Sequence, residues 1–201
     1  MEFLPYIYKW IEVLLRWSHV MFAILWIGNS FLFNYLDNKL EKNTTNEEVD
    51  ANGILQHSGW FYRVERLNAA PEKFSKNLII FKWQSYLTFI TGILLLIIIY
   101  YANAKILMID KRVNENITPL MGIAISIFSI IGSWLIYDLI CKSKLINNKI
   151  ILPVVLLIIG AVISFCLAKI FGSRFAFLSV GVILGCIMFF NVFFVIIPNG
   201  K

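Results

Sequence analysis

The sequence predicts an all-α protein, a polytopic transmembrane helix bundle of about five spans. Of the 201 residues, 59% are hydrophobic and only 15% are charged, and the mean hydropathy is +0.77. The apolar residues gather in runs of about 20, the length at which a helix crosses a bilayer. A soluble domain is roughly half apolar and a quarter charged. The soluble, disordered and collagen-like classes are therefore excluded.

The spans follow one another in a single membrane domain, 1–201, and are predicted at 13–36, 79–102, 117–140, 150–170 and 175–197. Each is helical because a chain exposed to lipid must satisfy its backbone hydrogen bonds internally. Pro119 and Pro153 suit the first turns of the third and fourth helices, and Pro198 suits the end of the fifth. The polar loop 37–78 contains an aromatic part, 56–62, that we expect to be ordered or interfacial. The N-terminus shows no basic leader, so no removable signal peptide is predicted.

Lysine and arginine counts predict the orientation. One side of the membrane has seven of these residues, in or beside the N-terminus and the loops near 103–116 and 171–174. The other side has eleven, counted for the long loop, the loop between the third and fourth spans and the C-terminus. Basic residues favour the cytoplasmic side. We therefore expect a bacterial inner-membrane protein with its N-terminus outside and the loop 37–78 in the cytoplasm. The net charge of +6 then indicates contact with anionic lipid, not nucleic acid.

The three cysteines, Cys141, Cys166 and Cys186, stand alone in or beside apolar runs. The sequence has no CxxC pair and no CxxCH motif. This excludes a covalent c-type haem in this chain and argues against a zinc site or a disulfide framework. We expect the cysteines to be small buried hydrophobic residues.

A polar stripe runs along the first helix at helical spacing. Its candidate cavity-lining members are Arg16, His19, Trp26, Ser30, Asn34 and Asp37. In a membrane such a stripe faces protein, a cofactor or a wet cavity. His19 is a candidate axial ligand of haem iron, and Arg16, one turn away, is a candidate partner for a haem propionate. The alternative is a histidine that only hydrogen-bonds between helices, and periodicity alone favours this alternative.

The second histidine, His57, lies in the loop beyond the inner end of that helix, roughly 25 Å of helix away from His19. Two histidines of this chain are therefore not expected to ligate one haem. A haem on His19 needs another sixth ligand, an open position or a histidine from another chain. His57 and the aromatics up to Tyr62 suit a planar polar substrate, bound by stacking and hydrogen bonding. The alternative is an interfacial aromatic anchor with a solvated histidine.

The remaining spans carry residues typical of helix packing. Small residues that are expected to allow close helix approach are Gly122, Ser126, Ser129 and Ser133 in the third span, Gly160, Ser164 and Ala168 in the fourth, and the GxxxG pair Gly181 and Gly185 in the fifth. Three polar residues share a face of the second span: Gln84, Thr88 and Thr91. Together with Asn191 in the fifth span, they either bridge helices or line the cavity of the first helix.

Several motifs occur in one order along the chain. The first helix has RWSH at 16–19, WIGNSFLF at 26–33 and LDN at 36–38, and the loop has HSGWFY at 57–62. Pro71, FKWQSY at 81–86 and Thr91-Gly92 follow, and the last helix has Gly181, Gly185, Met188 and NVFFVIIPN at 191–199. This series resembles the N-terminal transmembrane domain of the bacterial membrane-bound urate oxidase (urate hydroxylase) family.

The resemblance implies an oxidoreductase of purine catabolism that oxidises urate and passes electrons to a cytochrome c domain. It favours haem b on His19 and catalytic roles for His57 and Tyr62. The family continues into further spans and a cytochrome, so we expect a short form that depends on a cytochrome c or a second membrane polypeptide. Ser58 and Trp60 stand where the family has glycines. The alternative functions are a non-catalytic membrane scaffold or assembly subunit and, with weaker support, a small transporter.

Overall fold

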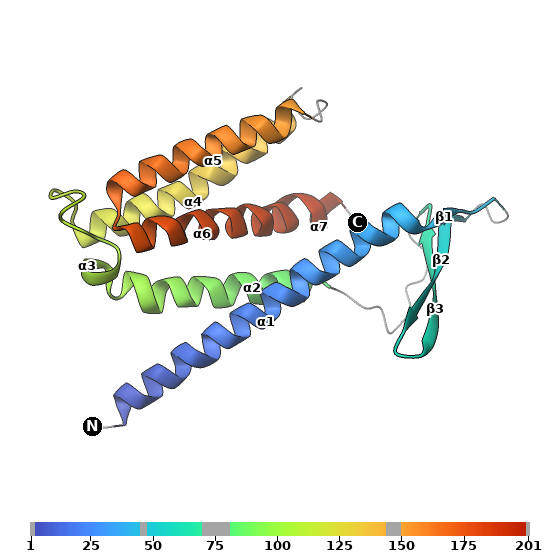
Figure 1. Ribbon diagram of the computed structural model, residues 1–201, viewed down its shortest axis with the longest axis horizontal. Coiled ribbons are helices and arrows are strands. Elements are labelled where there is room, and N and C mark those ends of the chain that lie inside the picture. The colour runs from blue at the N-terminus through green and yellow to red at the C-terminus, as the bar shows by residue number, and fades with distance from the viewer. Residues whose placement is uncertain (1–2, 45–47, 70–80, 144–149, 200–201) are drawn as a thin grey trace. The chain divides into compact units, whose positions relative to one another are not determined.

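The computed structural model describes residues 3–44, 48–69, 81–143 and 150–199 (Figure 1). The chain divides into two compact units. We call Met1–Phe22 with Ser85–Lys201 the helical unit, and Ala23–Gln84 the sheet unit. Each is described by itself below.

Five helices are long and apolar enough to cross a membrane, and this confirms the predicted fold class. They are α1 (Leu4–Lys39), α2 (Lys82–Leu95) with the π-helical η1 (Leu96–Tyr101), α4 (Pro119–Lys142), α5 (Ile151–Ile170), and α6 (Ser173–Asn191) with η3 (Val192–Ile196). Two short helices complete the set, α3 (Ala104–Leu107) and α7 (Ile197–Asn199). The predicted start of the second span, at 79, lies outside the described residues.

The helix α1 begins well before the predicted start at residue 13. Three charged residues, Lys9, Glu12 and Arg16, interrupt the apolar run there, which is why hydropathy predicts a span that starts later than the helix. No proline follows Pro5 within the helix, and proline is compatible with a first turn. Arg16 Nη2 also lies 2.6 Å from Glu12 Oε1 one turn away, a spacing at which an ion pair favours helix.

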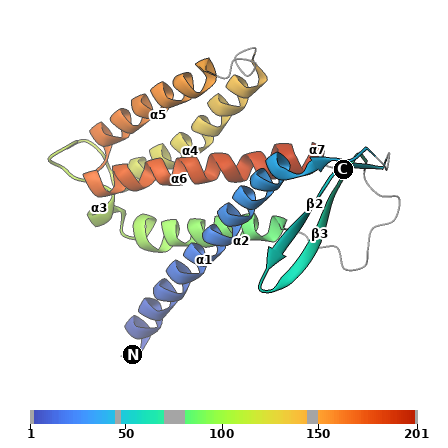
Figure 2. The ribbon, with the colours of Figure 1, turned by 45° about the vertical axis from the view of Figure 1, so that its right-hand side comes forward.

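The helical unit is built around α6, which packs against both α4 and α5 (Figures 1 and 2). Its contact with α2 is aromatic, because the rings of Phe89 and Phe189 are stacked with centroids 3.9 Å apart. At one end, Met108, Phe171 and Phe175 are fully buried. The amide of Gly172 donates to the carbonyl of Met108 at 3.0 Å and so ties the loop after α3 to the start of α6.

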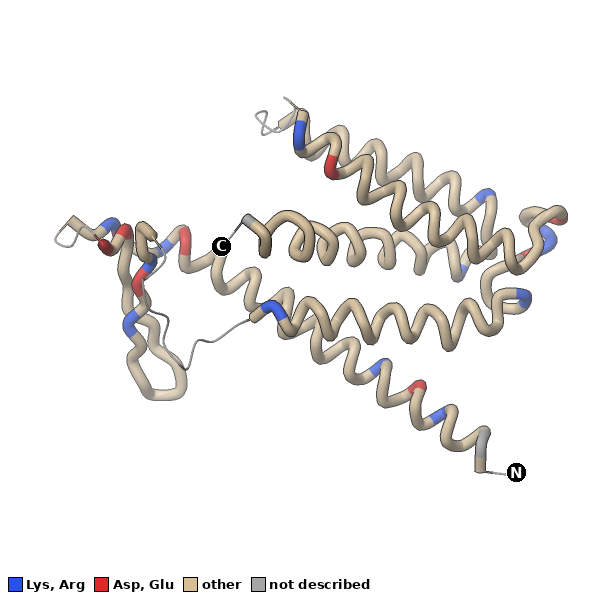
Figure 3. Tube along the Cα trace, turned by 180° about the vertical axis from the view of Figure 1, so that it is seen from behind, with Lys and Arg blue, Asp and Glu red and all other residues tan. Residues whose placement is uncertain are grey.

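Charged residues of α2, α4, α5 and α6 lie at or near the helix ends, as Figure 3 shows. The start of α4 is fixed by Thr118, whose hydroxyl accepts a hydrogen bond from the Met121 amide at 3.3 Å. Pro119 takes the first helical position, where its missing N–H leaves no partner unsatisfied.

Only part of the expected close helix approach is present. A Cβ at Gly122 would lie 3.5 Å from Phe171 Cε1, so this glycine does face a neighbour. At Gly160, Gly181 and Gly185 no described atom lies within 4 Å of the position that a Cβ would take. The prediction of close approach at these three glycines is therefore wrong, because they face away from the packed helices.

The sheet unit contains an antiparallel sheet in the order β1 (Glu41–Lys42), β2 (Val49–His57) and β3 (Trp60–Leu67). The sequence predicts that the aromatic part of this loop, 56–62, is ordered or interfacial, but it does not predict strands. The turn between β2 and β3 has positive φ at both central residues, 51° at Ser58 and 82° at Gly59. This geometry matches the twist of a two-residue hairpin.

Arg66 of β3 fastens the sheet to the end of α1. Its Nε lies 2.8 Å from Asp50 Oδ2 in β2, and its Nη1 lies 3.0 Å from Asp37 Oδ1 in α1. The hydrogen bonds that the Arg66 guanidinium donates, first to Asp50 and then to Asp37, raise its pKa above the ordinary value. Close by, a Cβ at Gly53 would lie 2.8 Å from Leu40 Cδ2, so the root of the hairpin is packed against the chain that leaves the helix.

Candidate functional site

The imidazole of His19 is held against α2 within the helical unit. Its Nδ1 lies 3.0 Å from the carbonyl oxygen of Thr88 and 3.1 Å from Thr91 Oγ1. A carbonyl oxygen only accepts, so the hydrogen bond to Thr88 requires the proton on Nδ1. In a neutral imidazole, Nε2 then keeps its lone pair. The contact thus selects the tautomer that presents a basic nitrogen.

Thr91 supports this arrangement from the next turn of α2. Its hydroxyl lies 2.7 Å from the carbonyl oxygen of Leu87, an acceptor that takes the hydroxyl proton and leaves the Thr91 oxygen free to accept from His19. The side chains of Thr88 and Thr91 are both buried. The polar contact is therefore shielded from water. Away from water, hydrogen bonds are electrostatically stronger.

Gly92 provides the room for the ring. A Cβ at this residue would lie 2.9 Å from Cε1 of His19 and 3.4 Å from Nδ1. Any side chain here would push the imidazole away from the Thr88 carbonyl. The dipeptide Thr91-Gly92 therefore fixes the position of His19 by one hydrogen bond and one close approach.

This geometry fits a haem ligand. Histidines that bind metals usually donate their other ring N–H to a carbonyl or carboxylate, which fixes the ring and raises the basicity of the ligating nitrogen. Within the described residues no group of three His, Cys, Asp or Glu side chains could hold a metal ion.

The other candidate residues of the stripe, and Asn191, have polar contacts of their own, and their role in lining a cavity stays a prediction. In the helical unit, Arg16 is exposed and paired with Glu12, and Asn191 lies beside Tyr137 of α4. In the sheet unit, Trp26 is half-buried, Ser30 donates to its carbonyl at 3.0 Å, and the carbonyl of Asn34 accepts from Asn38 at 2.8 Å. Asp37 binds Arg66.

Gln84 bridges two helices, one of the two possibilities left open by the sequence. Its Oε1 accepts a hydrogen bond of 2.7 Å from Asn29 Nδ2 of α1. Asn29 was missed because it lies off the polar stripe, although it belongs to the WIGNSFLF motif. Gly92 likewise belongs to a motif, Thr91-Gly92, but only the structure shows that it lies against His19.

His57 and Tyr62 lie on the same face of the hairpin in the sheet unit. In the ladder, His57 pairs with Trp60 and Leu55 pairs with Tyr62, and directly paired residues of an antiparallel sheet share a face. His57, Trp60 and Tyr62 are all exposed. The catalytic role of His57 and Tyr62 stays a prediction.

Ser58 takes a left-handed backbone conformation that glycine adopts without strain. Its φ of 51° is of the kind that costs a residue with a Cβ about 1–2 kcal/mol.

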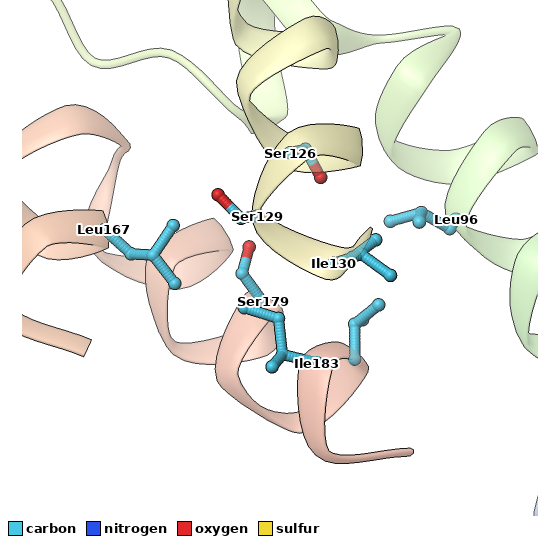
Figure 4. A pocket seen from close by; sticks show the side chains of 8 residues that line it. Leu96, Ser126, Ser129, Ile130, Leu167, Ser179 and Ile183 are labelled. Carbon is cyan, nitrogen blue, oxygen red and sulfur yellow. The ribbon is translucent and has the colours of Figure 1, made fainter. Parts of the chain in front are cut away.

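The serines of the small-residue stripe contribute to packing, as predicted. Figure 4 shows two of them, Ser126 and Ser129, together with Ser179 of α6, around a gap between α4, α5, α6 and η1 that has no room for a water molecule. The hydroxyls of Ser129 and Ser179 donate to carbonyls of their own helices at 2.7 Å. Ser126 Oγ lies 3.0 Å from the hydroxyl of Tyr101.

The fold and this site define a class: an all-α protein with five helices suited to a membrane and a histidine held between the first two. The sequence matches the family model described as urate oxidase N-terminal over residues 5–201, and the chain belongs to this family. No curated protein and no solved structure matches the chain.

Proposed function

We propose that the chain is the membrane domain of a redox system that oxidises urate and passes the electrons to a haem or cytochrome partner. Family membership supports the link to urate. The observation that carries the redox part is the hydrogen bond from Nδ1 of His19 to the Thr88 carbonyl at 3.0 Å, because it leaves Nε2 as the ligating nitrogen.

In this proposal His19 holds the iron of a haem b, and the haem supplies a one-electron acceptor when bound. Thr88 and Thr91 orient the imidazole, and Gly92 keeps the ring close to α2. Arg16 lies one helical turn from His19, where its guanidinium would pair with a propionate. Its present partner is Glu12 of the same helix, an exposed pair that exchanges at little energetic cost.

His57 and Tyr62 are proposed as the substrate contacts. Urate is planar and polar, and the shared face offers an imidazole for hydrogen bonding and aromatic rings for stacking. Removal of two electrons from urate requires an acceptor beyond a single haem. A cytochrome c or a second membrane polypeptide is the proposed acceptor, in a bacterial inner membrane with the N-terminus outside.

An absorption spectrum of the purified chain, oxidised and reduced, tests the haem site. We expect a Soret band and a reducible α band that are lost or shifted in His19→Ala and retained in His57→Ala, the matched control. An unchanged spectrum in haem-replete His19→Ala would disprove the ligand assignment. A folded chain that stays colourless after haem is added would instead support the non-catalytic scaffold.

A further inference from the structure

The β2–β3 hairpin changes in character along its length. Its root, next to α1, is charged and packed: Arg66 binds Asp37 and Asp50, and Val49 and Ala51 are buried. Its tip carries five apolar or aromatic residues, which we call the apolar tip: Ile54, Leu55, Trp60, Phe61 and Tyr62.

The apolar tip is exposed on both faces of the hairpin. Leu55, Trp60 and Tyr62 share one face, whereas Ile54 and Phe61 lie on the other, as the pairs Leu55–Tyr62, Gln56–Phe61 and Ile54–Arg63 require. Ile54 and Phe61 are each 75% exposed and Trp60 is 71% exposed. A hairpin that packs on a protein core is apolar on one face only. Apolar residues on both faces suit a tip that enters a nonpolar medium end-on.

The root of the hairpin is fixed to the end of a candidate span. β1 begins at Glu41, and α1 ends at Lys39. The ion pair of Arg66 with Asp37 joins β3 to the last turn of this helix. In Figures 1 and 2 the hairpin turns back from the end of α1 instead of continuing its direction. If α1 crosses a bilayer, its polar last turn lies at the water boundary, and the hairpin returns toward the lipid.

We propose that the apolar tip inserts into the boundary between the headgroups and the acyl chains of the bilayer. Trp and Tyr prefer this zone, since one part of the ring is apolar and another part is polar. Arg63 follows the tip directly and pairs with Glu65 at 2.9 Å. In that position its stem lies along the lipid while its guanidinium reaches the phosphates. The hairpin thereby holds the loop between α1 and α2 at the membrane surface. Lipid then covers Trp60 and Tyr62, so this insertion and the role of Tyr62 as a substrate contact exclude each other, and the accessibility experiment below decides between them.

Spin-label accessibility in the full chain, reconstituted in nanodiscs that contain anionic lipid, tests the proposal. The three cysteines are replaced by alanine, and one label is placed at Gln56→Cys. The matched control is Glu65→Cys, on the same face of the hairpin but at its root. At position 56 we expect collisions with oxygen to be more frequent than at 65, and collisions with a water-soluble nickel chelate to be several-fold rarer.

Two results would overturn the proposal. Equal accessibility of the nickel chelate at both positions places the tip in water. Low accessibility of both oxygen and nickel at position 56 shows that protein covers the tip. With Trp60→Ser and Phe61→Ser added, the label at 56 should become accessible to nickel, and a label that stays in lipid would show that these rings do not anchor the tip.

A second measurement keeps all three cysteines and needs no label. The fluorescence of Trp60 is taken as the difference between the unmodified chain and Trp60→Phe. We expect lipids brominated near the headgroup to quench this difference and aqueous iodide not to quench it; the reverse result would refute insertion. Neither experiment depends on haem or urate, so its failure is distinct from a failure of the proposed function.

Discussion

The ring of His19 lies so close to the backbone of Gly92 that a Cβ there would stand 2.9 Å from Cε1 of the imidazole. A methyl group at position 92 and the hydrogen bond from His19 to Thr88 are therefore mutually exclusive without movement of a helix or the ring. The pair links a small residue of α2 to the candidate iron ligand of α1.

The substitution Gly92→Ala should destabilise the helical unit and displace His19. Overpacking of this kind costs about 1–3 kcal/mol. Unfolding in detergent, followed by circular dichroism, measures the loss. Gly181→Ala is the matched control, because nothing described lies within 4 Å of its Cβ position and alanine is a better helix former than glycine by about 1 kcal/mol. Equal stability of the two variants would contradict the close contact.

Thr91→Val should weaken haem binding, because it removes a hydrogen-bond acceptor of His19 Nδ1 while the shape of the side chain is kept. Changes in the groups that orient a ligand typically lower metal affinity about 10–100-fold. Haem titration of the apoprotein measures the effect. Thr91→Ser should restore most of the affinity. Thr88→Val is the matched control, since Thr88 contacts His19 through its backbone carbonyl. A similar loss in both valine variants would show that the Thr91 hydroxyl has no special role.

The sequence predicted the helices well because lipid imposes a simple rule, about 20 apolar residues for each span. It missed the hairpin because its residues do not alternate between apolar and polar: Trp60, Phe61 and Tyr62 are consecutive and all exposed. Alternation is visible only where one face of a strand is buried.

The candidate site was predicted in part. Periodicity identified His19 and, separately, the face of α2 with Thr88 and Thr91, but it contained no information on which helix faces which. The role of Gly92 depends on a distance between two helices, and a pattern within one helix cannot show such a distance. Within the stripe, Ser30 and the carbonyl of Asn34 take part in hydrogen bonds inside α1, and helical spacing alone does not distinguish such residues from the lining of a cavity.

A pH dependence of stability is expected from Asp110, in the loop between the second and third spans. Hydrogen bonds from the side chain and then the backbone of Arg112 lower the pKa of this carboxyl below its ordinary value of 3.8. Because the folded pKa is the lower one, the pair stabilises the fold above the ordinary pKa, and this contribution is lost as pH falls through the folded pKa.

Thermal unfolding of the unmodified chain and of Asp110→Asn as a function of pH checks this expectation. The difference in Tm should be constant above about pH 5 and should shrink as the pH falls below about 4. When Arg112→Gln removes the partner from both proteins, the difference in Tm that Asp110→Asn causes should be smaller above about pH 5. A difference in Tm that grows on acidification would show the opposite sign of the pKa shift and contradict the ion pair as its cause.

The orientation is tested by two single cysteines placed in an otherwise cysteine-free chain. Glu115→Cys lies in the loop before α4, and Glu65→Cys lies in β3 at the exposed root of the hairpin. The bias of Lys and Arg toward the side of the hairpin predicts that a membrane-impermeant maleimide labels position 115 in spheroplasts, whereas position 65 reacts only after the membrane is permeabilised. Both cysteines should react in detergent, which controls for local accessibility. The reverse pattern would put the hairpin outside, together with His57 and Tyr62, so that urate would be met on the outer face and electrons would have to cross the membrane in the opposite sense.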